Sequence, residues 1–302
     1  MLFGRTADSF RAEIQFDGNH NHEHLYLTGE TVSGKLILHT AEQESISIPK
    51  LSLSFVGNLI WISRSKPTGG MFVPISDVNH RNLHKETLQL SSINDHCFTF
   101  AFTIPSGLPP STFASHYKSD GYIGYFLVLT YIHPKDETQV MEVQRIHVSP
   151  CISPVNDRLS MESILTNRDG LYVRIYMNPG YVSSSKPDLP LEITIENPKK
   201  QNIKQIKCQL IQKIQSQYYK TRQVLLDSTI PDIFNSTEKN LQKKFTLPIS
   251  ATVLQLPPTY VSPHDFGATK EIHIFYTLKI ECCVSGFNTN IKFKIPIFIS
   301  NN

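Results

Sequence analysis

Phe102-Thr103-Ile104-Pro105, followed by Leu108-Pro109-Pro110-Ser111 and Tyr125-Phe126-Leu127, forms a stretch that the chain uses twice. The second copy consists of Phe245-Thr246-Leu247-Pro248, Leu256-Pro257-Pro258-Thr259 and Tyr276-Thr277-Leu278. Because proline has no N–H to donate to a β-ladder, it favours strand ends and connections. Each copy therefore predicts a strand that ends at proline, a Pro-Pro connection and a returning strand that begins at tyrosine.

The segments that precede the two copies also correspond to one another. Apolar and polar residues alternate in 34–38 and 48–55 before the first copy, and in 191–195 and 203–210 before the second. Such alternation is typical of half-buried strands. The separation of about 150 residues is too long for a solenoid repeat and fits two similar domains.

We therefore predict an all-β fold, with two tandem antiparallel β-sandwiches of the immunoglobulin-like kind. The first is expected to span residues 1–150 and the second residues 151–302. The short hinge between them, 149–154, contains Pro150 and Pro154 and should be stiff. Only 158–167 could form a short helix, and 63–83 is expected to be mostly an exposed loop.

Composition limits the classes of function. Residues 1–159 carry a net charge of about −3 and residues 160–302 about +6, so the second half suits acidic partners, phosphorylated tails or anionic membrane surfaces. This excess is too small and too scattered to predict nucleic-acid binding. The five cysteines lack a Cys-x-x-Cys pair, which suits reduced thiols in the cytosol. Residues 1–8 lack the apolar core of a signal peptide, and no apolar run reaches membrane-spanning length.

Motifs of enzymes are missing from the sequence. It contains no Gly-x-Ser-x-Gly elbow, no phosphate-binding loop, no dinucleotide fingerprint and no convincing pair of carboxylates. We therefore expect a protein that is not an enzyme, with no catalytic residue and no cofactor.

At four places the sequence resembles the arrestin family, specifically its α-arrestin branch of arrestin-related trafficking adaptors. The matching motifs are Thr28-Gly29-Glu30-Thr31-Val32-Ser33-Gly34, the strand 46–57, Phe100 to Pro105 with Leu108 to Ser111, and Ile193-Thr194-Ile195-Glu196-Asn197. The resemblance covers nearly the whole chain. It implies an arrestin N-like sandwich in 1–150 and an arrestin C-like sandwich in 151–302.

The resemblance also implies a function. It implies a non-catalytic cytoplasmic adaptor that binds the cytoplasmic tails of membrane proteins. Such an adaptor can also associate peripherally with the plasma membrane or with endosomes. A HECT-type ubiquitin ligase with WW domains would then couple this cargo to endocytosis or sorting. The alternative is a structural subunit of a trafficking coat, similar to the arrestin-like subunit of retromer.

Pro257, Pro258 and Tyr260 form a Pro-Pro-x-Tyr motif, which WW domains bind as an extended polyproline-II ligand. The first half has Pro109-Pro110-Ser111 at the equivalent place without a tyrosine at the fourth position. The prolines can therefore serve the fold alone, and both interpretations stay open.

His20, His22 and His24 are spaced by two residues, so an extended chain would point all three to one side, where they could share a zinc or nickel ion. The alternative is a polar loop that enters a strand. We predict no metal site but keep these three residues as candidates.

Lys199, Lys200, Lys204 and Lys207 could form a patch for acidic or phosphorylated cargo tails. The alternative is a solvated outer face of the sheet. Lys204 and Lys207 differ by an odd number, so a regular strand would place them on opposite faces.

Overall fold

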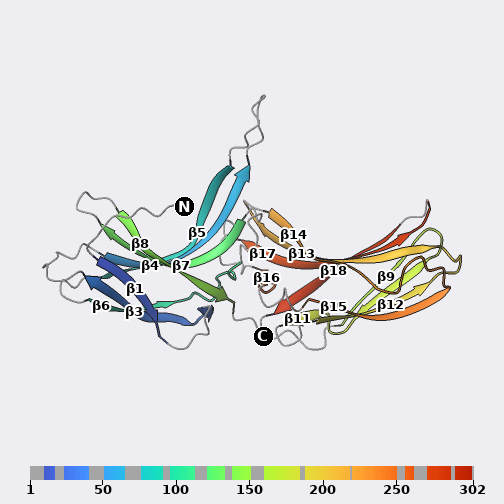
Figure 1. The fold of residues 1–302 in the computed structure, drawn as a ribbon, viewed down its shortest axis with the longest axis horizontal. Coiled ribbons are helices and arrows are strands. Elements are labelled where there is room, and N and C mark those ends of the chain that lie inside the picture. Colours follow the sequence, from blue (N-terminus) through green and yellow to red (C-terminus); the bar gives the residue numbers. More distant parts are fainter. Residues whose placement is uncertain are drawn as a thin grey trace, which may run out of the picture. The chain divides into compact units, whose positions relative to one another are not determined.

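The computed structural model describes residues 10–17, 24–40, 51–64, 76–90, 96–112, 121–132, 138–150, 160–183, 188–217, 220–249, 256–261, 271–286 and 290–300. Every regular element in these ranges is a β-strand (Figure 1). By its internal contacts the chain divides into two compact units, residues 1–114 with 120–151, and residues 115–119 with 152–302. The predicted all-β class is confirmed.

The first unit contains two sheets. Its three-stranded sheet has the order β1-β3-β6 and its five-stranded sheet the order β2-β8-β7-β4-β5. The strands are β1 (Phe10–Phe16), β2 (Leu25–Leu27), β3 (Thr31–Thr40), β4 (Leu51–Arg64), β5 (Ser76–Leu90), β6 (Cys97–Thr103), β7 (Gly121–Ile132) and β8 (Thr138–Ser149).

The second unit repeats this plan with one strand added to each sheet. Its sheets have the orders β15-β12-β10-β9 and β11-β18-β17-β13-β14, and β16 also pairs with β17. The strands are β9 (Met161–Thr166), β10 (Tyr172–Met177), β11 (Tyr181–Ser183), β12 (Asp188–Glu196), β13 (Ile203–Ser216), β14 (Lys220–Thr229), β15 (Asn240–Pro248), β16 (Tyr260–Val261), β17 (Ile272–Val284) and β18 (Ile291–Ser300).

The repeat includes an unusual pairing. In each unit a three-residue strand runs parallel to the last strand, while the named pairs around it are antiparallel. Leu25 stands opposite His147 in the first unit, and Tyr181 stands opposite Phe298 in the second. The two halves therefore share their topology in detail.

The duplicated Pro-Pro stretch holds the same place in both units. The Tyr125 hydroxyl donates to the Pro109 carbonyl at 2.6 Å, and the Tyr276 hydroxyl donates to the Pro257 carbonyl at 2.5 Å. Each unit thus ties its Pro-Pro connection to the central strand that follows it, β7 or β17.

The residue two positions after each of these prolines pairs with the last strand of the unit. The Ser111 hydroxyl accepts a hydrogen bond from the Val148 N–H at 2.8 Å, and the Thr259 hydroxyl accepts one from the Ile299 N–H at 2.9 Å. The Ser111 and Thr259 N–H groups donate to the carbonyls of the same two partners. These shared contacts explain why the two segments look alike in sequence.

Each unit encloses its own apolar core, because the strands alternate buried and exposed side chains. In the first unit Phe55 lies between Phe102 and Tyr125, with ring centroids 6.2 and 6.0 Å apart. In the second unit the inward residues of β13 and β17, such as Leu210 and Leu278, are fully buried.

Two expectations about local structure differ from the structure, and one strand was missed. Residues 158–167 do not form a helix in their described part, because Met161–Thr166 pairs with β10 as strand β9. The expected loop 63–83 is strand from Ser76 on, since β5 pairs with β4. Strand β14 was not expected. The hinge from Cys151 to Pro154 lies outside the described residues.

Candidate functional site

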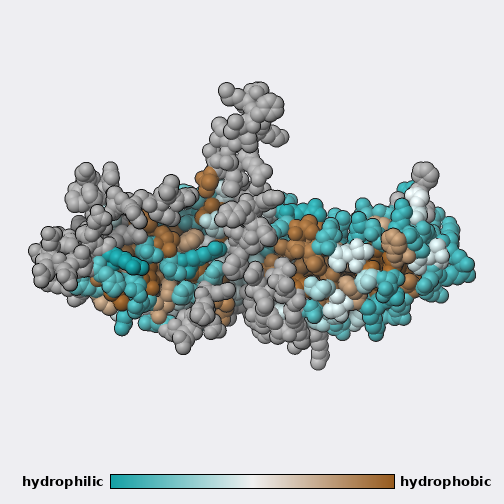
Figure 2. Space-filling model, viewed as in Figure 1, coloured by the Kyte–Doolittle hydropathy of each residue, from teal (hydrophilic) through white to brown (hydrophobic). Residues whose placement is uncertain are grey.

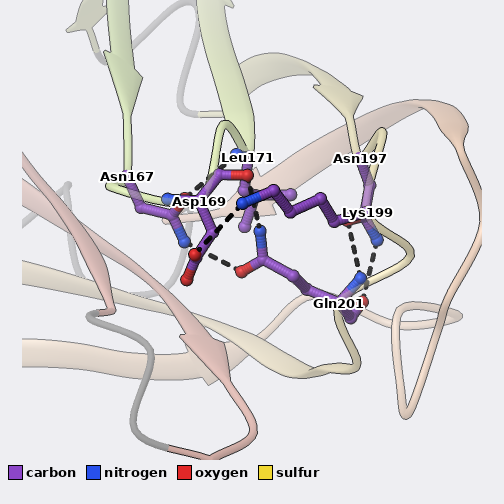
Figure 3. Close-up of polar contacts among 6 residues, drawn as sticks. All are labelled: Asn167, Asp169, Leu171, Asn197, Lys199 and Gln201. Carbon is purple, nitrogen blue, oxygen red and sulfur yellow. Dashed lines mark hydrogen bonds and ion pairs between the residues drawn. The ribbon is translucent and has the colours of Figure 1, made fainter.

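Lys199 and Lys200 lie in the turn between β12 and β13. Side chains of this turn contact the loop between β9 and β10 (Figure 3). The Asn197 side chain is fully buried, accepts from the Gln201 N–H at 2.8 Å and donates to the Gln201 carbonyl at 2.8 Å. These two bonds close the turn around the lysines. Lys200 has a positive φ of 52°, which fits a tight turn.

The neighbouring loop between β9 and β10 is built in the same way. The Asn167 carboxamide oxygen accepts from the N–H groups of Asp169 and Leu171, both at 3.0 Å, while its amide nitrogen donates to the Gln201 side chain at 3.0 Å. The Lys199 ammonium lies 3.4 Å from the Asp169 carboxylate. Lys199 therefore forms an ion pair within the second unit, and the turn stabilises the contact between these two loops.

Lys204 and Lys207 are both exposed, although a regular strand with Lys207 outward would turn Lys204 toward the core. The register between β13 and β17 shifts between Ile203 and Gln205. A β-bulge inserts one residue and interrupts the two-residue alternation. Lys204 occupies this bulge, so a regular-strand argument could not place it.

Lys207 belongs to a larger cationic surface, which we call the outer face. It is the side of the strands β13, β14, β17 and β18 that points away from the core of the second unit. The register pairs Lys207 with Glu281, Lys213 with Arg222 and Lys279 with Lys294. Among the described residues of these strands, the outward cations are Lys207, Lys213, Lys220, Arg222, Lys279, Lys292 and Lys294, and the outward carboxylates are Asp227 and Glu281.

Glu281 neutralises part of this surface. Its carboxylate lies 3.3 Å from the ammonium groups of Lys279 and Lys292 and accepts a 2.9 Å hydrogen bond from the Asn290 side chain. The hydrogen bond from Asn290, with help from the two lysines, lowers the pKa of Glu281. Glu281 therefore stays ionised and holds two of the seven cations.

The other five cations of the outer face do not contact Glu281. Among the described residues no ion pair is found for Lys207, Lys213, Lys220, Arg222 and Lys294. Lys207 and Lys279 line a hollow of about 220 Å³ together with Gln209 and Glu281. Figure 2 shows many hydrophilic residues on the visible face of the second unit, and the residues listed above give the outer face its positive charge. This surface can hold carboxylates or phosphate groups from a partner.

The Pro-Pro-x-Tyr segment is packed into the fold. Pro257 and Pro258 are buried, and the Tyr260 side chain is 7% exposed. Tyr260 pairs with Ile274 of β17, and Thr259 is bonded to Ile299. A WW domain needs the tyrosine to enter its own pocket, so the structure favours the interpretation that these prolines serve the fold.

His24 is the only one of the three histidine candidates within the described residues. Its ring lies against that of Phe16, with centroids 4.1 Å apart, and its carbonyl accepts a hydrogen bond from the His147 N–H at 3.1 Å. His20 and His22 lie outside the described residues. Where the chain is described, no three histidines, cysteines or carboxylates cluster in a way that could hold a metal ion.

The comparisons with known proteins concern the second unit. Residues 187–302 match the family model described as Arrestin (or S-antigen), C-terminal domain. None of the curated proteins compared with the chain matches it. No helix in the described ranges is long and apolar enough to cross a membrane. The matched region contains the whole outer face.

Proposed function

We propose that the chain is a non-catalytic arrestin-like adaptor of the α-arrestin kind. The outer face of its second unit binds acidic or phosphorylated cytoplasmic segments of membrane proteins. The observation that carries the proposal is the excess of outward cations over outward carboxylates on β13, β14, β17 and β18. The arrestin C-terminal domain match over the same strands supports it.

The charges suit an extended acidic segment. Lys213 and Arg222 stand side by side on neighbouring strands, and Lys279 and Lys294 do the same. Such pairs of like charge are unfavourable next to each other unless an anion lies between them. A carboxylate or phosphate of the partner would remove this repulsion and form charge-assisted hydrogen bonds.

Fluorescence anisotropy with the full chain tests this proposal. The probe is a labelled twelve-residue peptide in which glutamate alternates with serine, and a peptide with glutamine in place of glutamate is its neutral control. We expect the double variant Lys207→Glu, Lys294→Glu to bind the acidic peptide roughly tenfold more weakly, with a loss that shrinks as salt is added. The double variant Lys35→Glu, Lys85→Glu in the first unit changes the net charge equally at exposed sites and should bind normally. Equal binding by the two double variants would contradict the proposal.

The proposed role extends to ubiquitin-dependent endocytosis or sorting through a HECT-type ligase, in the cytoplasm and at the surface of the plasma membrane or endosomes. For Tyr260 to serve as the WW ligand, the segment would have to leave β17. A pull-down with WW domains compares the wild type with Tyr260→Ala. Equal capture by the two proteins would remove this motif from the proposal and leave the cargo surface untouched.

A further inference from the structure

An uncharged row of residues crosses the middle of the outer face. Its members stand opposite one another on β14, β13, β17 and β18, and they are Val224, Ile211, Thr277 and Pro296. We call them the apolar row. Val224 is 46% exposed and Pro296 is also exposed, whereas Ile211 is almost completely buried. The centre of this positive face therefore offers apolar side chains to a partner.

A pair of cations lies on each side of the apolar row. On one side Lys279 stands opposite Lys294. On the other side Lys213 stands opposite Arg222. Phe275, which is 38% exposed, is the partner of Lys213 on β17. The exposed apolar surface thus extends from the row to the second pair of cations.

These apolar side chains form a group. Pro296 and Phe298 are both exposed on the same face of β18, and Phe275 and Val224 reach the row from the other strands. Single exposed apolar residues are ordinary on protein surfaces, but a contiguous apolar patch with a polar rim is typical of an interaction site. Here the rim is positively charged on two sides, which identifies the charge of the partner.

The register also gives the distance between the two pairs of cations. The pairs lie four residues apart along β17, and their centres lie two strands apart, which corresponds to about 13 Å and about 10 Å. The diagonal is about 16 Å, which an extended chain covers in about five residues. A segment that reaches both pairs must cross the apolar row, because the row lies between them.

We propose that the outer face selects acidic segments with an apolar side chain midway between two acidic groups that are about five residues apart. This inference rests on the proposed function and specifies which acidic segments bind. The acidic groups form charge-assisted hydrogen bonds with the two pairs of cations. The apolar side chain packs on Val224 and Phe275, whereas a polar side chain in its place would gain no burial.

The shape of the outer face favours a peptide over a membrane as the partner. Valine and proline side chains are shorter than those of the lysines and the arginine on either side, so the apolar row lies below the charged groups. A peptide side chain can reach down to this row. An apolar surface must sink about 5–10 Å into a bilayer, which this arrangement opposes.

Fluorescence anisotropy with the full chain and three labelled peptides tests the inference. The first peptide is Ser-Glu-Glu-Ser-Leu-Ser-Glu-Glu-Ser, the second has serine in place of leucine, and the third has the leucine exchanged with the last serine. All three have the same charge and the same acidic spacing. We expect the first peptide to bind about tenfold more tightly than the other two. Added salt should weaken all three and leave this ratio unchanged.

Two matched double variants locate the preference. Val224→Thr, Phe275→Thr should bind all three peptides as the wild type binds the serine peptide, and threonine keeps the propensity for β-structure. Ile164→Thr, Leu165→Thr is the control, because it replaces apolar residues on β9 that are 48% and 41% exposed. This control should keep the tenfold preference.

Several outcomes would overturn the inference. Equal affinity of the wild type for all three peptides would remove the apolar selection and leave the proposed function intact. Failure to bind any peptide would remove the proposed function as well. Equal affinities together with loss of sedimentation with phosphatidylserine vesicles in Val224→Thr, Phe275→Thr would assign the apolar row to a membrane. The double variant Lys207→Glu, Lys294→Glu should weaken all three peptides by the same factor.

Discussion

The two units hold their Pro-Pro connections with the same tyrosine, but the residue opposite that tyrosine differs. Gly57 stands opposite Tyr125 in the first unit, and Gln212 stands opposite Tyr276 in the second. Gln212 is buried and donates a 2.8 Å hydrogen bond to the Tyr276 hydroxyl. In the first unit a Cβ on Gly57 would lie 2.5 Å from a ring carbon of Tyr125. The same anchor is therefore stabilised by close packing in one unit and by an added polar contact in the other.

A duplicated contact can therefore keep its geometry while the residues around it change from apolar to polar.

The buried side chains with shifted pKa values are also distributed unequally between the two units. In the second unit burial raises the pKa of Tyr276 and raises the pKa of the Cys208 and Cys282 thiols to about 12. Among the described residues of the first unit, a raised pKa is found for Tyr26.

The largest expected effect is a difference in alkaline stability between the units. The folded thiols of Cys208 and Cys282 keep their protons up to about pH 12, whereas unfolded thiols lose them near pH 9. Their stabilisation is therefore complete below pH 9 and is lost as the pH rises toward 12. From pH 9 to pH 11 the second unit should lose about 4 kcal/mol of unfolding free energy.

Two probes separate the units in this experiment. The fluorescence of Trp61, the single tryptophan, reports on the first unit, and a far-UV circular dichroism transition that Trp61 does not follow reports on the second. The double variant Cys208→Val, Cys282→Val should remove most of the pH dependence. Simultaneous unfolding of both units as the pH rises would contradict the prediction.

A second prediction concerns the replacement of Gly57 by glutamine, the residue that stands opposite the equivalent tyrosine in the second unit. Gly57→Gln should destabilise the first unit by about 3 kcal/mol or more, because the new side chain meets the buried ring of Tyr125. Denaturant unfolding followed by Trp61 fluorescence measures the change. Gln212→Gly is the reverse exchange and should cost less, since it removes one hydrogen bond and causes no clash. A Gly57→Gln protein as stable as the wild type would show that the ring can move aside.

A third prediction removes the two hydroxyls. Tyr276→Phe should cost about 2–3 kcal/mol, because it leaves both the Pro257 carbonyl and the buried Gln212 amide without this partner. Tyr125→Phe should cost about 1–2 kcal/mol through the Pro109 carbonyl. Denaturant unfolding of both variants checks the order. A larger loss for Tyr125→Phe would mean that the added contact with Gln212 contributes little.

The smallest effect is expected at the turn of Lys199. Its ion pair with Asp169 is exposed, so Lys199→Ala should change the unfolding free energy by less than about 0.5 kcal/mol. Asn197→Ala in the same turn is the contrasting variant and should cost about 2 kcal/mol, because two buried hydrogen bonds are lost. Thermal unfolding of the two variants measures the difference. Equal losses of stability would mean that the Asn197 hydrogen bonds contribute no more than the Lys199 ion pair.

Much of the fold could be predicted because its strongest signals are local. The alternation in 191–195 and 203–210 identified β12 and part of β13, and the repeated Pro-Pro stretches mark real and equivalent contacts. A short helix was allowed at 158–167, where the structure has strand β9, because Met161, Ile164 and Leu165 fit helical spacing as well as Met161, Ser163 and Leu165 fit a strand. Pairing with β10 decides between them, and a six-residue stretch does not contain that information.

The candidate site was less predictable, since it depends on register and exposure. Lys204 is exposed like Lys207, although the two positions differ by an odd number, because a bulge lies there, and a bulge leaves no clear mark in a polar strand. The other members of the outer face come from four strands far apart in the sequence. Phe275 could have been noticed as an aromatic at a polar position of the alternation in β17, but its place between two pairs of cations follows only from the register.

The parallel pairing of β2 with β8 and of β11 with β18 has a consequence during synthesis. A ribosome releases strands in the order of the chain, and β8 and β18 each lie between the strand made just before them, β7 or β17, and a short strand made much earlier, β2 or β11. Neither sheet can close until its final strand has left the exit tunnel, so the unfinished edges stay open to chaperones or to mispairing in the meantime. The nascent first half can finish folding while the second is still being translated.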